Sequence, residues 1–445
     1  MFALDRPGHA FGGPGIGVHP EEIVRHEAEL AALGITHVRF EAGPSWTYVS
    51  PPLGASVSAA EIADYIRDHF NHDAPRAKTM REAARVLKRR DIKTILINYH
   101  LPFAWLSSET HRTLKRDNDE SVVDLWIGLL QFLKADTGFV PDYIEIANEP
   151  DGHWNGHIPV HRYYQIARTL RKRLDQEGLA RVQILGPGVS NLAKDRLGAR
   201  WVRGANAPAM AAIAGWSFHA WDEIYRPGAG PPFVDQTWRE LRAAIARQPA
   251  RPIFLTEYAT QSTRFGGKTY QSNGSSALYT AVETEGYALR TLVNAMIHMN
   301  RGVHVPVLWT FADRDDDRRH WGTISSPATG SYYRPVFKLL RRVAPFLPAK
   351  SRVVPMQDAP DYARCAATLI RKGEALYLIA ANHSTETAQR RVEFSGADQI
   401  AIKSSELVRI DALEQIAPLQ VRVIANEALQ IRIPGEAIAL VRIAL

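Results

Sequence analysis

Residues 142–150 of the chain read DYIEIANEP. Apolar and polar side chains alternate through the first part of this stretch, which is the pattern of a β-strand. The alternation stops at Asn148 and Glu149, and Pro150 then breaks the chain. The stretch predicts a buried strand that presents a carboxylate at an opening.

A second stretch, residues 252–258 (PIFLTEY), has the same design and brings Glu257 to the end of a strand. If both strands belong to one parallel barrel, their carboxyl ends lie at the same face, and Glu149 and Glu257 face one another. Two facing carboxyl groups are the catalytic equipment of glycosidases. The alternative is that each glutamate only forms an ion pair at the end of its strand.

Short apolar runs alternate with helical patterns along most of the chain, which implies a parallel sheet. Eight such repeats within about 345 residues fit a closed (β/α)8 TIM barrel better than an open doubly wound sheet. The expected strands are 15–18, 36–40, 92–100, 143–148, 182–185, 215–219, 253–257 and 303–311. Helices are expected from Pro20 to Gly34, before strands 92–100 and 143–148, and near 159–176, 235–247, 278–299 and 332–343.

The pattern changes after about residue 348, where short strands are separated by Gly, Pro and Asn. Such a pattern is typical of a small antiparallel β-sandwich. We therefore expect a barrel domain over 1–347 and a β-sandwich accessory domain over 348–445. The segments 41–75 and 258–277, which follow two barrel strands, are candidate walls of a cleft.

The composition is that of an ordinary globular protein, with 45% hydrophobic and 23% charged residues in 445. The net charge is +7, but the basic residues are dispersed, which argues against nucleic-acid binding. No apolar run of about 18 residues predicts a membrane span. The first residues lack the features of a secretory signal, which favours a cytoplasmic location, or a secreted or periplasmic one if a signal was removed.

Neither a metal nor a cofactor is expected. Cys365 is the only cysteine, so a disulfide within the chain and a cysteine metal site are excluded. The histidines lack the spacing of a zinc site. Four aspartates, at 313 and 315–317, lack the pattern of a calcium loop, and their arginine neighbours indicate a solvated ion-pair loop instead.

Hydrolysis of a sugar acetal with retention needs one proton donor and one nucleophile. We assign the acid/base role to Glu149, with a pKa raised by limited solvent and by the charge of its partner. Glu257 is then the ionised nucleophile. Carboxyl groups about 5 to 5.5 Å apart are expected for such a pair.

Other polar residues end predicted strands, where barrel enzymes place their chemistry. Arg39 is expected to bond Glu257, or else to form a structural ion pair, for example with Glu41. Asn148 is expected to bond a sugar hydroxyl, or else to cap the following turn. His100 and His219 are candidates for contacts with sugar hydroxyls or with a carboxylate.

Flat aromatic side chains stack on pyranose rings, and several tryptophans lie in or beside predicted loops. Each is equally compatible with a place in the core, because Trp is highly buried on average. The platform candidates are Trp46, Trp154, Trp221 and Trp309, of which Trp309 at the end of the last barrel strand is the best placed.

The stretches 143–151, 216–221 and 253–258 resemble strands four, six and seven of clan A glycoside hydrolases. Over residues 14 to 345 the chain is most similar to family 39, because a sandwich follows the barrel and the sequence GPGV occurs at 186–189, while families 79 and 5 share much of the pattern. The resemblance implies a (β/α)8 barrel with Glu149 as acid/base, Asn148 at the sugar 2-hydroxyl and Glu257 as nucleophile. Two departures concern the sugar subsite: Ala147 stands where relatives have Trp, and Trp221 where they often have Tyr.

These observations predict a retaining β-glycoside hydrolase that acts on a polysaccharide or oligosaccharide by double displacement. The alternative is a barrel that binds carbohydrate without catalysis. The sugar, its linkage, endo or exo action and the oligomeric state stay open.

Overall fold

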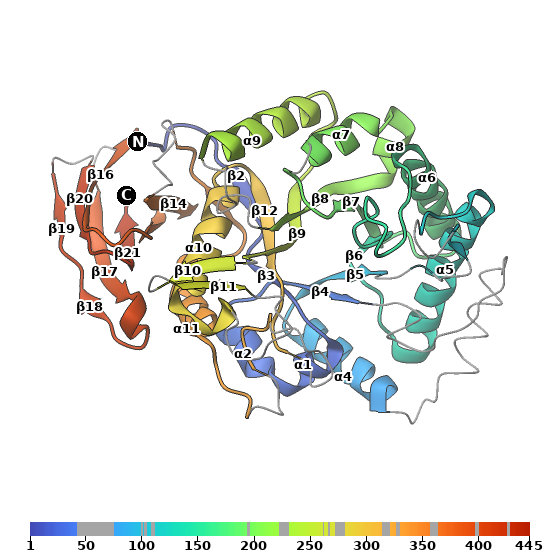
Figure 1. Cartoon of the computed structure of the whole chain (residues 1–445), viewed down its shortest axis with the longest axis horizontal. Coiled ribbons are helices and arrows are strands. Elements are labelled where there is room, and N and C mark those ends of the chain that lie inside the picture. The colour runs from blue at the N-terminus through green and yellow to red at the C-terminus, as the bar shows by residue number, and fades with distance from the viewer. Residues whose placement is uncertain are drawn as a thin grey trace.

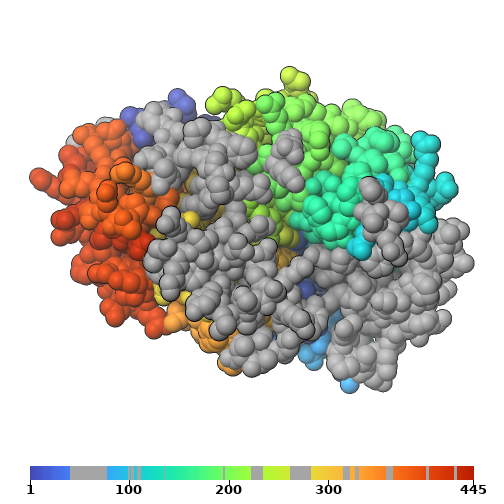
Figure 2. Space-filling model, in the orientation of Figure 1, coloured from blue at the N-terminus to red at the C-terminus, as the bar shows by residue number. Residues whose placement is uncertain are grey.

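A computed structural model gives the fold, a barrel surrounded by helices with two sheets packed at one end (Figure 1). In the space-filling view these sheets form one end of an elongated molecule (Figure 2). The structure describes residues 1–41, 75–98, 101, 105–107, 112–193, 196–221, 231–260, 262–265, 268–271, 281–313, 321–325, 330–356, 364–396, 400–424 and 428–445.

Eight parallel strands close the barrel, in the order β12-β3-β4-β5-β6-β7-β8-β9. This confirms the predicted (β/α)8 fold. The strands are β3 (Gly15–Gly17), β4 (His37–Glu41), β5 (Lys93–Ile97), β6 (Tyr143–Glu145), β7 (Gln183–Val189), β8 (Ile213–Trp221), β9 (Ile253–Ala259) and β12 (Val303–Leu308).

Helices surround the barrel and bury an apolar stripe against it. In α6 (Val160–Gln176) the stripe is Tyr163, Ile166, Leu170 and Leu174, all at helical spacing and all buried. The other helices are α1 (Pro20–Arg25), α2 (Glu27–Ala32), α4 (Pro75–Arg89), α5 (Asp119–Phe132), α7 (Leu197–Gly204), α8 (Ala207–Ala212), α9 (Pro231–Ile245), α10 (Glu285–Met299) and α11 (Pro335–Val343). None of the helices described is long and apolar enough to cross a membrane.

The structure shifts several of the predicted boundaries. The helix expected from Pro20 to Gly34 is two helices, because the backbone of His26 leaves the helical conformation between α1 and α2. The strand expected to reach residue 148 ends at Glu145, and the one expected to reach 311 ends at Leu308. After β6 the buried apolar residues Ile146 and Ala147 precede Asn148 and Glu149, so the strand pairing stops before the polar residues are reached.

The second part of the molecule consists of two sheets that enclose an apolar core, as predicted for a β-sandwich. The core includes Leu369, Leu378, Val392, Leu429 and Val441. The larger sheet has the order β18-β17-β21-β15-β14-β13-β2 and the smaller one β1-β16-β20-β19. Their C-terminal strands are β13 (Ser351–Val353), β14 (Cys365–Lys372), β15 (Ala375–Asn382), β16 (Ala388–Ser395), β17 (Ala401–Arg409), β18 (Ala417–Pro418), β19 (Val421–Val423), β20 (Ala428–Ile433) and β21 (Ala437–Ala444).

The first residues of the chain also belong to these sheets. The strand β1 (Phe2–Ala3) pairs with β16, and β2 (His9–Phe11) pairs antiparallel with β13. The sandwich is therefore built from both ends of the chain, and both termini lie beside it (Figure 1). The domain division near residue 347 stays a prediction.

Three histidines lose much of their contact with solvent in the fold: His37 on β4 and His298 on α10 are buried, and His9 on β2 is half-buried. Burial lowers the pKa of His298 to about 3 from an ordinary value of 6.5, and that of His37 and His9 to about 4. The unfolded chain takes up these protons below about pH 6.5, whereas the folded chain resists them. Their contribution to stability is complete above pH 6.5 and is lost as the pH falls through the folded pKa values.

We expect His298→Gln to weaken the acid sensitivity of the fold. Glutamine retains an oxygen that can accept the hydrogen bond of Trp238, which His298 now accepts through Nδ1. Urea unfolding between pH 6 and pH 4 should show a slope of the unfolding free energy smaller by about 1.4 kcal/mol per pH unit, the share of one proton. The exposed His161→Gln is the control, with the wild-type slope. An unchanged slope in His298→Gln would contradict the assignment.

Candidate active site

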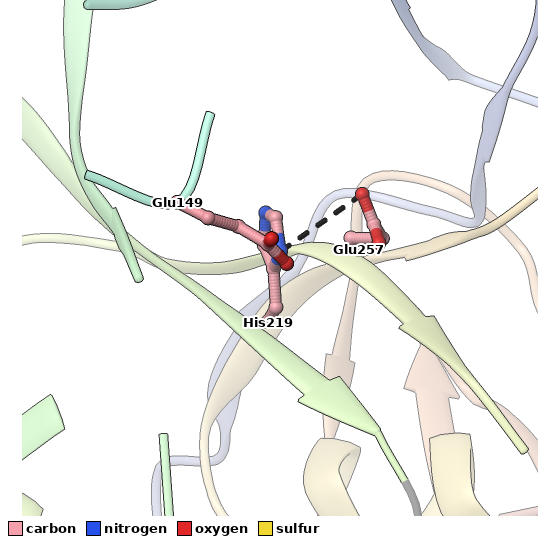
Figure 3. A group of neighbouring side chains, drawn as sticks. All are labelled: Glu149, His219 and Glu257. Atoms are coloured by element: carbon pink, nitrogen blue, oxygen red, sulfur yellow. Dashed lines mark hydrogen bonds and ion pairs between the residues drawn. The ribbon is translucent and has the colours of Figure 1, made fainter. Parts of the chain in front are cut away.

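Three titratable side chains meet at the carboxyl ends of the barrel strands (Figure 3). Glu149 follows β6, His219 lies near the end of β8, and Glu257 lies in the last part of β9. An oxygen of each glutamate and a ring nitrogen of His219 all lie within 4.8 Å of one another. The two glutamates singled out in the sequence therefore do face each other.

The backbone places Glu149 in a conformation that is rare for a residue with a side chain. Its φ is 49°, in the left-handed region. Two backbone hydrogen bonds hold the segment there. The backbone N–H of Asn148 donates to the carbonyl of Asn98, and the backbone N–H of Glu149 donates to the carbonyl of Gly188. Such strain persists only where the surroundings impose it, and it is concentrated at functional sites.

Arg39 is the centre of the site and is completely buried. Its Nη1 donates to Glu257 Oε2 at 2.8 Å and its Nε to Glu145 Oε2 at 2.9 Å. Its Nη2 donates to Asn148 Oδ1 at 2.6 Å. The expected bond between Arg39 and Glu257 is thus present, and the other acid that binds Arg39 is Glu145.

The same guanidinium fixes the tautomer of His219. Arg39 Nη2 lies 3.2 Å from His219 Nε2, and a guanidinium can only donate. When the ring carries a single proton, that proton therefore lies on Nδ1, which is 2.9 Å from Glu149 Oε1 and donates to it.

Each of the two facing glutamates also accepts a hydrogen bond from an indole. Trp221 Nε1 donates to Glu257 Oε1 at 2.9 Å, and Trp154 Nε1 donates to Glu149 Oε2 at 2.5 Å. The two indoles differ in exposure: Trp221 is 7% exposed and Trp154 52%. The donor to Glu257 is part of the core, while the donor to Glu149 stands at the surface.

The surroundings separate the acidities of the two glutamates. Burial acts to raise the pKa of Glu149, but the hydrogen bond and charge of His219 and the hydrogen bond of Trp154 outweigh it and hold this pKa below its usual value. Burial raises the pKa of Glu257, although the charges of His219 and Arg39 oppose this. Burial acts to lower the pKa of His219, but the nearby carboxylates outweigh it and raise it.

These directions are the reverse of the sequence prediction, which gave Glu149 the raised pKa and left Glu257 ionised. The prediction considered burial and the partner's charge alone. It missed the two donors to Glu149, a ring nitrogen and an indole nitrogen, which favour the ionised form.

Among the described residues, one group of possible metal ligands lies close enough together to share an ion. This group is Glu149, His219 and Glu257. Arg39 already bonds Glu257 and touches His219, so a positive charge is built into the cluster. That charge would repel a cation, and the site fits a neutral substrate better than a metal.

The segment after β12 supports the site from outside. Asp313, predicted in a solvated loop, is instead buried, and its carboxylate lies 2.7 Å from Nη2 of the buried Arg334. Its other oxygen accepts from the amides of Trp321 and Gly322. The ring of Trp321 packs edge-on against Trp221 at 4.9 Å, so Asp313 holds the residue against which the donor to Glu257 rests.

We expect Asp313→Ala to lower the free energy of unfolding by about 3 kcal/mol, because it leaves the buried guanidinium of Arg334 with Glu283 as its remaining acid partner. The near-ultraviolet circular dichroism of the Trp221 and Trp321 pair should weaken as their contact loosens. Asp313→Asn, which keeps one acceptor oxygen but loses the charge and the second acceptor, should fall between. Wild-type dichroism together with a loss below about 1 kcal/mol would contradict this account.

The remaining predicted residues have mixed outcomes. Trp309 is half-buried, with its ring over Gly17 and 5.8 Å from the guanidinium carbon of Arg39. His100 and Trp46 lie outside the described residues, as do residues 42–74 of the first expected cleft wall. The second expected wall contains a hairpin of β10 (Ser262–Phe265) and β11 (Lys268–Gln271).

The sequence analysis missed Glu145 and Thr256. Glu145 is completely buried and bonds Arg39, and Thr256 Oγ1 donates to Glu145 Oε1 at 2.8 Å. A signal for Glu145 was present, because an acid inside an apolar strand needs a buried partner. Nothing in the sequence distinguishes Thr256 from an ordinary strand threonine.

No protein-family model matches the chain, and comparison with curated proteins finds no match. Solved structures do match: 100% of the chain aligns with 99% of a glycoside hydrolase family 30 subfamily 8 xylanase from Clostridium acetobutylicum, at 10% identity and a TM-score of 0.66.

Two solved structures of family 39 are similar as well. All of the chain aligns with 96% of the GH39 enzyme from Xanthomonas axonopodis pv. citri, at 14% identity and a TM-score of 0.56. In the second structure, a family 39 glycoside hydrolase from the gut symbiont Bacteroides cellulosilyticus, 97% of the chain aligns with 81% of that protein, at 14% identity and a TM-score of 0.58. The chain therefore shares its fold with these glycoside hydrolases, as the resemblance led us to expect.

Proposed function

We propose that the protein is a glycoside hydrolase that cleaves β-glycosidic bonds with retention of configuration. The observation that carries this proposal is the approach of the two carboxyl groups, with oxygens of Glu149 and Glu257 within 4.8 Å. Retaining enzymes hold their carboxyl groups about 5 to 5.5 Å apart, whereas inverting enzymes need about 6.5 to 9.5 Å to admit a water molecule. The likeness of the fold to known glycosidases supports the same class.

In the first step Glu257 attacks the anomeric carbon. The new bond joins a Glu257 oxygen to that carbon, the bond to the leaving oxygen breaks, and Glu149 gives its proton to that oxygen. In the second step Glu149 takes a proton from water, the water oxygen bonds the anomeric carbon, and Glu257 leaves. Arg39 and Trp221 hold one Glu257 oxygen each, and this orients the nucleophile.

The residues around the pair suit a sugar. The amide oxygen of Asn148 is bonded by Arg39, so its amide nitrogen is the group that remains for a sugar hydroxyl. Trp309 offers an aromatic face beside Arg39. We infer a β-linked oligosaccharide or polysaccharide as substrate, in line with the xylanases among the similar structures.

Azide provides the sharpest test of the two roles. In Glu149→Ala, the rate of hydrolysis of a glycoside with a poor leaving group should fall about 10²- to 10⁴-fold. Azide should then intercept the glycosyl intermediate formed from an activated aryl β-glycoside and give the β-glycosyl azide. In Glu257→Ala, azide should replace the missing nucleophile and give the α-glycosyl azide. Chromatography and NMR of the products distinguish the two anomers.

Labelling separates catalysis from binding alone. A 2-fluoro glycoside with a good leaving group should attach covalently to Glu257, as peptide mass spectrometry would show, and Glu257→Gln should remain unlabelled. A fully folded Glu257→Gln that hydrolyses aryl glycosides at the wild-type rate would overturn the proposal. A wild-type protein that binds sugars but gives no adduct would point to a carbohydrate-binding barrel instead.

A further inference from the structure

Glu149 has only one oxygen that can present a proton to a substrate. Oε1 accepts from His219 Nδ1, and His219 is completely buried. Oε2 accepts from Trp154, whose ring is half exposed. A leaving group that arrives from solvent therefore meets Oε2, the oxygen on which the indole of Trp154 already lies.

The indole has a defined seat beside Glu149. It lies so close over Gly152 that a β-carbon there would come within 2.3 Å of the ring. The amide of Gly152 donates to the carbonyl of Glu149, which ties this seat to the carboxylate. Any side chain at position 152 would push the indole off Oε2.

The hold on the indole is nevertheless weak. More than half of the Trp154 surface faces solvent, whereas Trp221, the donor to Glu257, is closed into the core. Little apolar area is lost when an exposed ring moves. The donor to the acid is therefore free to be replaced, and the donor to the nucleophile is fixed.

We propose that Trp154 is a positioning residue displaced by the substrate, an inference that rests on the function proposed above. In the free protein its N–H caps Oε2 of Glu149. A sugar on the leaving-group side takes the place of this N–H and stacks on the indole face, and Glu149 then bears its proton toward the glycosidic oxygen. The chemical class of the leaving group is a sugar ring with a flat apolar face, rather than a small alcohol.

The displacement accounts for the unexpected acidities. In the free site the indole contributes to the low pKa of Glu149, along with His219 and the charge of Arg39. Among the described residues, Glu257 also faces Glu149, and its negative charge favours a proton on Glu149. Once the indole N–H has left Oε2, one of the donors to the carboxylate is lost, so the pKa of Glu149 rises and the acid form is favoured when a leaving sugar is present.

The test is the pH dependence of hydrolysis of a disaccharide, whose poor leaving group makes the first step limiting. In the free site Glu149 has the lower of the two pKa values, so the acidic limb of kcat/KM reports Glu149 in the free protein, and that of kcat reports it in the complex. In the wild type the acidic limb of kcat should lie at higher pH than that of kcat/KM, by about half a unit to one unit.

Two variants remove the cap in different ways. Trp154→Phe keeps a flat ring but has no N–H, and Gly152→Ala leaves the indole intact but moves it away. Both should raise the acidic limb of kcat/KM to that of kcat. Trp221→Phe is the comparator, because it removes the donor to Glu257 instead, and it should move the basic limb to higher pH and leave the acidic limb in place.

Coincident acidic limbs of kcat and kcat/KM in the wild type, or an acidic limb of kcat/KM that neither variant moves, would overturn the inference. Trp154→Ala, which loses the ring face too, should also raise KM for the disaccharide more than Trp154→Phe does. The azide and labelling results test the proposed function separately, so they can succeed while this inference fails.

Discussion

The buried guanidinium of Arg39 holds the mouth of the barrel together. It donates to acceptors that follow or lie on β6, β8 and β9, so one side chain on β4 connects strands across the lumen. A charge in this position costs several kcal/mol of lost hydration unless it is fully compensated. Two carboxylates, Glu145 and Glu257, supply that compensation. Lysine has no planar fork of five donors and does not fit the same set of acceptors.

This arrangement makes the two facing glutamates unequal. Glu257 is held by a guanidinium and a buried indole, both of which are fixed by the core. Glu149 lies on a strained backbone after the end of β6, with one oxygen turned inward and the other outward. A rigid nucleophile and a more adaptable acid are what double displacement requires, because the acid must serve two different oxygens in turn.

The sequence was informative wherever one strand or helix decides the outcome. The spacing of the apolar residues, and the Gly, Pro and Asn residues between segments, predicted the eight barrel strands and the sandwich. They also predicted the glutamates near the ends of β6 and β9. They did not predict how donors from different strands meet. The link from Arg39 to Glu145, the bond from His219 to Glu149, and the ion pair of Asp313 with Arg334 all join residues far apart in the chain. The acidities of the two glutamates depend on contacts of this kind, with His219 and Arg39. The reversed order of the two pKa values has the same origin.

The pairing of β1 and β2 with the C-terminal sheets has a consequence for how the chain folds. The first eleven residues are made before any of their partners, and the barrel is enclosed between the two halves of the sandwich in chain order. During synthesis the opening segment waits unpaired until the last hundred or so residues emerge. The two sheets beside the barrel are therefore complete only after β1 and β2 have paired with β16 and β13.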